Sequence, residues 1–159
     1  MKNADLLLTM DPASGRIAGG GVLVRENVIE QVGPSESLPK EADRVFDASG
    51  MLVLPGLINT HHHLYQTLTR ALPGAQDVEL FDWLTRLYPV WGEMDDRAVH
   101  ASALIGMAEL VLSGCTTTTD HLYIYPNDSS LDATIRAAAP HQKRRAKQRR
   151  QVAFAIQPT

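Results

Sequence analysis

The sequence predicts an α/β chain in two parts, a small β unit over residues 1–55 and a βαβ unit over residues 56–139. Short β-like runs separated by turn residues fill the first part. In the second part an apolar strand, helical stretches and a β-branched strand follow one another. The dipeptide Pro55-Gly56 marks the change from one pattern to the other.

Composition limits the class of protein before any motif is considered. The 159 residues suffice for one domain with a core, but a complete (β/α)8 barrel usually needs about 250. Hydrophobic residues make up 44% and charged residues 21%, which excludes wholesale disorder and a fibrous chain. A single cysteine, Cys115, and the absence of a leader pattern favour a reducing, cytoplasmic compartment. No apolar run approaches the ~20 residues that cross a bilayer, which excludes a membrane-spanning role.

The first part has the pattern of a small antiparallel β unit, part of a β-sandwich. Turn-forming residues separate its apolar runs, for example Glu26-Asn27 and Gly33-Pro34. The predicted strands are Asp5 to Thr9, Gly20 to Arg25, Val28 to Val32, Arg44 to Asp47 and Met51 to Leu54.

The second part alternates strands and helices. A strand is predicted from Leu57 through the three histidines that end at His63, and another from Cys115 to Thr119. Helices are predicted for Phe81 to Trp91, Asp95 to Ser113 and Ser129 to Ala139, from apolar spacing, acidic first turns and a stop at Gly114. The connection between the two strands is long enough to make them parallel.

The last 20 residues differ in charge from everything before them. All 18 acidic residues precede residue 140, whereas six of the 15 basic residues follow it. Since residues 140–159 show no apolar periodicity, we expect a solvated or aberrant tail. Binding of this basic run to nucleic acid is the less favoured alternative, and we expect no nucleic-acid partner.

His61 and His63 are the strongest candidates for chemistry. Alternate side chains of a strand share a face, so these two imidazoles are expected to project together while His62 points away, either as a packing residue or as a support of the ligands. Two imidazoles at this spacing suit zinc or another divalent metal such as iron. A pair of histidines exposed by accident on a surface strand is the alternative, but the end of a buried parallel strand is where α/β barrels build active sites.

The pattern Pro55-Gly56 followed by Asn59-x-His61-x-His63 closely resembles the first metal motif of the amidohydrolase superfamily. The resemblance covers residues 4–139 and includes Phe81-Asp82-Trp83-Leu84 and the stretch from Gly114 to His121. Within the superfamily the chain is most similar to the purine and triazine deaminase subgroup, above all to 8-oxoguanine deaminases. The resemblance implies that residues 56–139 are the first strands and helices of an incomplete (β/α)8 barrel.

The resemblance also implies a mechanism, in which zinc activates water to attack an electron-poor ring carbon and ammonia leaves. The substrate would be a small heterocycle, and members of the family are often homo-oligomers. Only His61 and His63 match the family's ligands, and the further histidines and the aspartate that it supplies from later strands find no match here. We therefore expect this chain to be an inactive part of a longer enzyme, the break after Ala139 being a frameshift or a gene-model error.

Three further side chains are candidates for the same site. The Gln66 amide is expected to read the edge of the substrate, the alternative being a solvent-facing loop residue. Trp83 could stack on a flat ring, but its helical spacing equally suits a core position. His121 follows a strand end and could support the metal ligands from the same face, but a structural hydrogen-bonding pair with Asp120 is the favoured interpretation.

Two functions of different classes follow from the sequence. One is a zinc-dependent hydrolase that deaminates 8-oxoguanine, or guanine or a triazine in its close relatives. The other is a truncated, non-catalytic product that binds metal or a partner chain. The sequence separates these two only poorly, because just two metal ligands can be named.

Overall fold

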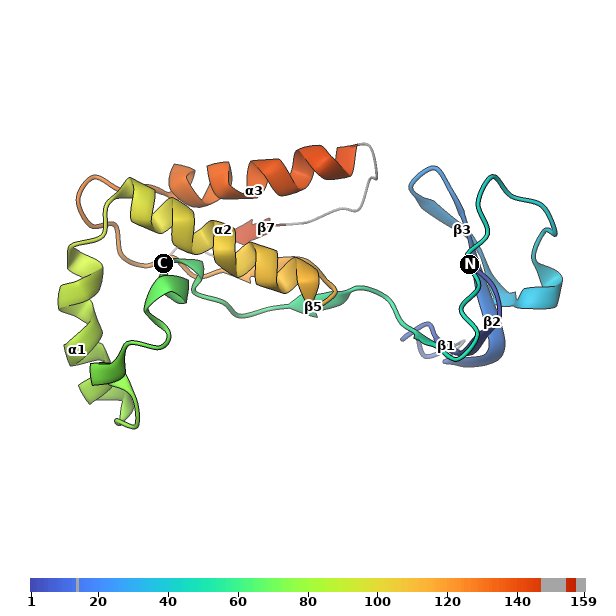
Figure 1. Cartoon of the computed structure of the whole chain (residues 1–159), viewed down its shortest axis with the longest axis horizontal. Coiled ribbons are helices and arrows are strands. Elements are labelled where there is room, and N and C mark those ends of the chain that lie inside the picture. The colour runs from blue at the N-terminus through green and yellow to red at the C-terminus, as the bar shows by residue number, and fades with distance from the viewer. Residues whose placement is uncertain (14, 147–153, 157–159) are drawn as a thin grey trace. The chain divides into compact units, whose positions relative to one another are not determined.

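The computed structural model of the protein describes residues 1–13, 15–146 and 154–156. The chain divides into two compact units, Met1–Gly56 and Leu57–Thr159, and each is described by itself (Figure 1). Among the described residues, no helix is both long and apolar enough to span a bilayer.

The first unit is a four-stranded sheet with the order β3-β2-β1-β4. Ala4, Leu7 and Ala48 form its small buried cluster. The strands are β1 (Ala4–Leu8), β2 (Arg16–Arg25), β3 (Val28–Pro34) and β4 (Leu52–Val53), and a short 3-10 helix, η1 (Ser35–Ser37), follows β3. Pairing is antiparallel for β1 with β2 and for β2 with β3.

Two expectations for this unit are wrong. Strand β4 pairs parallel with β1, because the long connection after β3 carries the chain across the sheet before it pairs. Residues 44–47 form no strand, and only an isolated bridge joins Lys2 to Asp47. The Asp47 carboxylate accepts hydrogen bonds from the Ser49 backbone and side chain, at 3.2 and 2.7 Å, so this stretch closes a local turn instead.

The second unit is built on a parallel sheet with the order β5-β6-β7. Its elements are β5 (Leu57–Asn59), η2 (Leu64–Thr69), η3 (Pro73–Ala75), α1 (Leu80–Gly92), α2 (Asp96–Leu112), β6 (Cys115–Asp120), α3 (Leu131–Ala146) and β7 (Phe154–Ile156). The predicted order of strand, helices and parallel strand is therefore confirmed, although β5 is shorter than expected. Helix α3 begins two residues later than expected.

Two stretches of the expected tail have regular secondary structure, and whether they are solvated stays a prediction. Helix α3 continues past residue 139 to Ala146, and β7 pairs parallel with β6. After Pro140 and His141 the helix consists of Gln, Lys, Arg and Ala, which are all good helix formers, so a run without an apolar stripe can still be helical. The rest of the predicted tail, residues 147–153 and 157–159, lies outside the described residues.

Helix α2 has clear start and stop signals. The Asp95 side chain accepts a hydrogen bond of 2.8 Å from the Ala98 amide, which satisfies one of the free N–H groups of the first turn. Gly114, at φ +84°, follows the helix and turns the chain into β6. Figure 1 shows α2 and α3 side by side, and Ala103 and Met107 of α2 pack in one cluster with Ala137 and Ala138 of α3.

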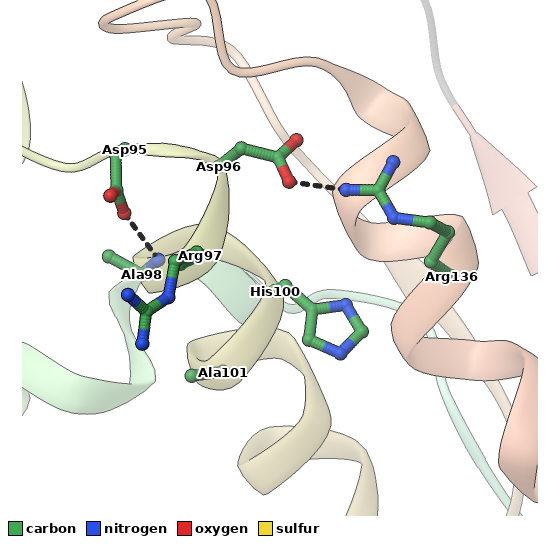
Figure 2. A pocket seen from close by; sticks show the side chains of 7 residues that line it. All are labelled: Asp95, Asp96, Arg97, Ala98, His100, Ala101 and Arg136. Carbon is green, nitrogen blue, oxygen red and sulfur yellow. Dashed lines mark hydrogen bonds and ion pairs between the residues drawn. The ribbon is translucent and has the colours of Figure 1, made fainter.

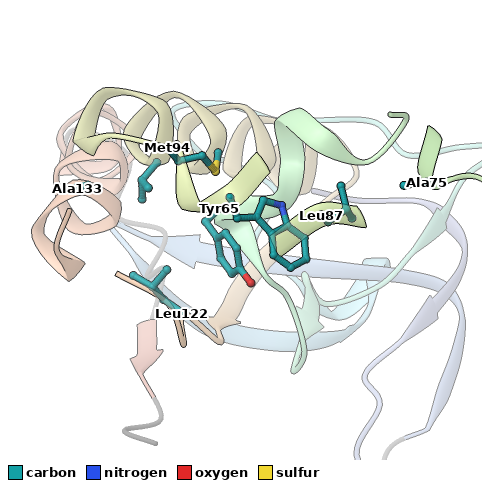
Figure 3. Packing of buried hydrophobic residues seen from close by; sticks show 8 residues of the cluster. Tyr65, Ala75, Leu87, Met94, Leu122 and Ala133 are labelled. Carbon is teal, nitrogen blue, oxygen red and sulfur yellow. The ribbon is translucent and has the colours of Figure 1, made fainter. Parts of the chain in front are cut away.

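The main core lies between η2, α1, α2 and the loop after β6 (Figure 3). Leu64 and Tyr65 open η2, and both are fully buried. They lie in the two clusters of this unit, Leu64 with α2 and α3 and Tyr65 with Trp91. The core therefore holds the chain immediately after His63, and it fixes where the histidines can lie.

Candidate metal centre

The histidines follow β5 instead of belonging to it. The strand ends at Asn59, whereas the sequence predicted a strand through His63. The Asn59 side chain accepts a 3.1 Å hydrogen bond from the His61 amide and so turns the chain out of the sheet ladder. His61 and His63 still converge as expected, and their Nε2 atoms are 3.2 Å apart.

The backbone carbonyl of His121, the residue directly after β6, fixes the proton on His63. Its Nδ1 lies 2.8 Å from the His121 carbonyl oxygen, which can only accept. Nδ1 is therefore the protonated nitrogen, and Nε2 presents a lone pair toward His61. A hydrogen bond from the second ring nitrogen to a carbonyl is the usual support of a metal-binding histidine.

The spacing of the pair fits one metal ion. Two nitrogens that each lie about 2.0–2.1 Å from a tetrahedral zinc are roughly 3.3 Å from one another. The 3.2 Å between the two Nε2 atoms agrees with that value. Among the residues that the structure describes, no group of three or more His, Cys, Asp or Glu could hold a metal, so this pair alone offers two ligands where catalytic zinc usually has three.

His121 lies against the pair without joining it. Its ring stacks on His61 with the centroids 4.5 Å apart, and its backbone carbonyl holds His63. This position beside the ligands is compatible with the predicted supporting role, which stays a prediction. Its Nε2 is buried and has no hydrogen-bond partner among the described residues.

His62 is directed differently from its neighbours. A Cβ added at Gly106 of α2 would lie 3.7 Å from Cε1 of His62, so its ring packs against that helix. Burial, and then the nearby Arg70 charge, lower the pKa of His62. Burial against α2 thus favours the neutral form of His62.

Asp120 is the last residue of β6 and directly precedes His121. Its side chain is 3% exposed, and Oδ1 accepts a 2.9 Å hydrogen bond from the Leu64 amide. Burial raises the pKa of this carboxyl, while the hydrogen bond from the Leu64 backbone opposes that rise. The sequence pointed to Asp120 only as a partner of His121, and its bond to Leu64 was missed.

A polar and aromatic network surrounds Gln66. Its Nε2 donates to the Tyr65 hydroxyl at 2.8 Å and to the Tyr123 hydroxyl at 3.2 Å. The Tyr123 ring meets His63 edge to face, with the ring centroids 5.3 Å apart. Gln66 is therefore linked to the histidine pair through Tyr123. Burial raises the pKa of Tyr65. Substrate contact by Gln66 stays a prediction.

Both tyrosines of this network were missed from the sequence. The signal was the two-residue spacing, since Tyr65 follows His63 and Tyr123 follows His121 at that interval. Trp83, the other substrate candidate, packs against the main core, with its ring 5.3 Å from Trp91. That arrangement matches the core alternative, and a role in stacking on substrate stays a prediction.

A surface pocket lies elsewhere, at the start of α2 (Figure 2). It has a volume of about 640 Å³. Its lining consists of Asp95, Asp96, Arg97, Ala98, His100, Ala101 and Arg136. Arg136 of α3 forms an ion pair with Asp96 across it, and none of the histidine pair lines it.

The comparison with protein families matches residues 52–149 to the model described as Amidohydrolase family. The chain belongs to the Amidohydrolase family. The match begins in β4 and includes the histidine pair, the network around Gln66, β6 and all of the described α3.

Curated relatives of this family member are named as deaminases and hydrolases. An 8-oxoguanine deaminase from Pseudomonas aeruginosa is 43% identical over 120 residues, which is 75% of this chain and 27% of that protein. A hydroxydechloroatrazine ethylaminohydrolase from a Pseudomonas species is 35% identical over 131 residues, again 75% and 27% of the two chains. The chain thus spans about a quarter of the length of these relatives.

Solved structures show the same likeness in three dimensions. The atrazine chlorohydrolase of Arthrobacter aurescens, solved in complex with zinc, superposes with a TM-score of 0.79 at 29% identity. The likeness covers 98% of this chain and 34% of that one. A protein whose structure resembles this chain is therefore known in complex with zinc.

Proposed function

We propose that this chain carries the first metal-binding element of a zinc-dependent hydrolase that deaminates a small aminated heterocycle with release of ammonia. The supporting observation is the His61–His63 pair, whose Nε2 atoms are 3.2 Å apart while a backbone carbonyl holds the proton of His63 on Nδ1. Iron or another divalent metal is the alternative occupant, because imidazole suits these metals too.

The first substrate candidate is 8-oxoguanine. It rests on the 43% identity to the Pseudomonas aeruginosa enzyme of that name. A triazine is the second candidate, favoured by the TM-score of 0.79 to the atrazine chlorohydrolase. Both substrates are flat rings with electron-poor carbons, so one arrangement of metal and polar groups could serve either.

Each candidate residue has a part in this proposal. His61 and His63 hold the metal, and His121 supports them from the side. A bound zinc would supply Lewis-acid activation of water. The Gln66 amide would meet a polar edge of the ring, held in place by the two tyrosine hydroxyls. Trp83 of α1 would stack on one face of the substrate ring.

We propose that β5, β6 and β7 are the first three strands of a (β/α)8 barrel and that residues 1–55 are part of a β-sandwich. In such a barrel the histidines lie at the carboxyl end of the first strand, where active sites form. Further metal ligands are needed beyond the two described here, so we expect the chain alone to release no ammonia. A non-catalytic metal-binding product is the alternative.

A chimera tests the proposal. The segment of the Pseudomonas aeruginosa 8-oxoguanine deaminase that aligns with this chain over 120 residues is replaced by the corresponding residues of this chain. Zinc-dependent release of ammonia from 8-oxoguanine is then measured. We expect activity in the chimera and in its His100→Gln control. His61→Ala and His63→Ala should each lower this activity by more than about 100-fold. Even the loss of a residue that only hydrogen-bonds to a metal ligand lowers metal affinity or activity by about 10–100-fold. Undiminished activity in these two variants would refute the proposal.

A further inference from the structure

Beyond the last paired residues of β5 and β6, three hydrogen bonds replace the sheet ladder. The ladder ends where Asn59 faces Thr118. Further on, the His121 amide donates to the His62 carbonyl at 2.8 Å, His63 Nδ1 donates to the His121 carbonyl at 2.8 Å, and the Leu64 amide donates to Asp120 Oδ1 at 2.9 Å.

We infer that Asp120 is a positioning residue for the His61–His63 pair. It holds this pair in place by anchoring the chain directly after His63. Of the three bonds, only the one to Asp120 uses a side-chain acceptor, so it alone depends on the residue type at the end of β6. The other two bonds come from the backbone and the ring of the histidines themselves.

Because the hydrogen bond from Leu64 to Asp120 is buried, its loss should have a large effect on the local structure. Leu64 is fully buried and Asp120 is 3% exposed, so water cannot readily replace the lost acceptor. A buried amide without a partner is costly, and the chain would shift to satisfy it. Such a shift starts one residue from His63 and would lengthen the bond from its Nδ1 to the His121 carbonyl.

The consequence falls on the proton of His63. With the bond intact, Nδ1 is protonated and Nε2 is free to bind a metal. With the bond loosened, the single ring proton is no longer confined to Nδ1, and the fraction of His63 with a free Nε2 lone pair for a metal falls. Asp120 thus acts on the metal through Leu64 and His63, without touching it.

The inference rests on the proposed function only where it concerns metal affinity. The tautomer of His63 in the metal-free chain tests the anchor by itself. It is read from the nitrogen-15 chemical shifts of the imidazole, which separate a protonated from an unprotonated nitrogen. A second readout is the affinity for zinc, measured by competition with a zinc-binding dye.

The test compares Asp120→Ala and Asp120→Glu with Asp120→Asn, at a temperature where circular dichroism shows each variant folded. Asparagine keeps an acceptor at the same place, so we expect the wild-type tautomer and zinc affinity. Alanine removes the acceptor and glutamate displaces it. Both should give mixed tautomers and about 10–100-fold weaker zinc binding. If alanine prevents folding, glutamate carries the test.

Val99→Ala is the matched control for lost stability. Val99 is buried in the main core on α2 and makes none of the three bonds. It should lower the melting temperature and leave the His63 shifts unchanged. A single unshifted tautomer in Asp120→Ala and Asp120→Glu would overturn the inference. Absent zinc binding by the wild type, together with shifted tautomers in these variants, would refute the proposed function alone.

Discussion

Trp91 should be the more important of the two tryptophans for stability. It is fully buried, and its indole Nε1 donates a 3.0 Å hydrogen bond to the Thr69 hydroxyl. Its ring meets Tyr65 at 5.4 Å and Trp83 at 5.3 Å, both edge to face. Trp91 therefore ties α1 to η2, the segment that follows the histidines.

The substitution Trp91→Phe keeps an aromatic ring and removes the N–H group. The lost hydrogen bond should cost about 0.5–1.5 kcal/mol. The smaller ring should cost roughly 1 kcal/mol more, for a cavity of about 40 Å³ at ~24 cal/mol per Å³. We expect the free energy of unfolding to fall by about 1.5–2.5 kcal/mol, measured by urea denaturation followed by far-ultraviolet circular dichroism.

Trp83→Phe is the matched control. Trp83 is only partly buried against the same cluster, and among the described residues its indole nitrogen makes no hydrogen bond. We expect a loss below about 1 kcal/mol for a partly exposed site. A larger loss for Trp83→Phe than for Trp91→Phe would contradict the reasoning, because burial and hydrogen bonding both rank Trp91 higher.

Two further predictions concern other parts of the chain. Gly106→Ala should destabilise the protein by about 1–3 kcal/mol, because its Cβ would lie 2.7 Å from Thr67 Oγ1 and 2.9 Å from Leu64 Cδ2. The control Gly92→Ala places its Cβ where nothing lies within 4 Å. It should leave the free energy of unfolding unchanged in the same urea assay. Hydrogen bonds from Ser49 and then Asn3 lower the pKa of Asp47 below its ordinary 3.8, so its contribution to stability should be complete above about pH 4 and lost as the pH falls through the lowered pKa. Urea denaturation at pH 5 and pH 3 should show the stability gap between wild type and Asp47→Asn shrinking, and a gap that grows at pH 3 would contradict this sign.

The sequence was sufficient for the parallel β5–β6 unit, because apolar periodicity and capping are local signals. Asp95 and Gly114 mark the ends of α2 as expected. The parallel pairing of β4 could not be read, since it depends on where a long connection lands in space. The strand β7 was missed because the basic run before it drew attention away from the short apolar run Phe154–Ile156.

In the candidate site, too, some features could be predicted from the sequence and others could not. The spacing of His61 and His63 predicted a shared direction, and their Nε2 atoms do converge. The role of the β6 end could not be predicted, because Asp120 meets Leu64 across 56 positions of sequence. Such a contact follows only from the packing of the two strands and of η2 against the core.

The most direct test of the central claim is a zinc titration of the purified chain, read by competition with a zinc-binding dye. We predict one zinc site, weakened at least about tenfold by His61→Ala and by His63→Ala. His62→Ala and His100→Gln should leave the affinity unchanged, because these rings contact α2 and α3. Zinc binding that survives both His61→Ala and His63→Ala, or that is lost equally with His100→Gln, would contradict the assignment of this pair as the metal ligands.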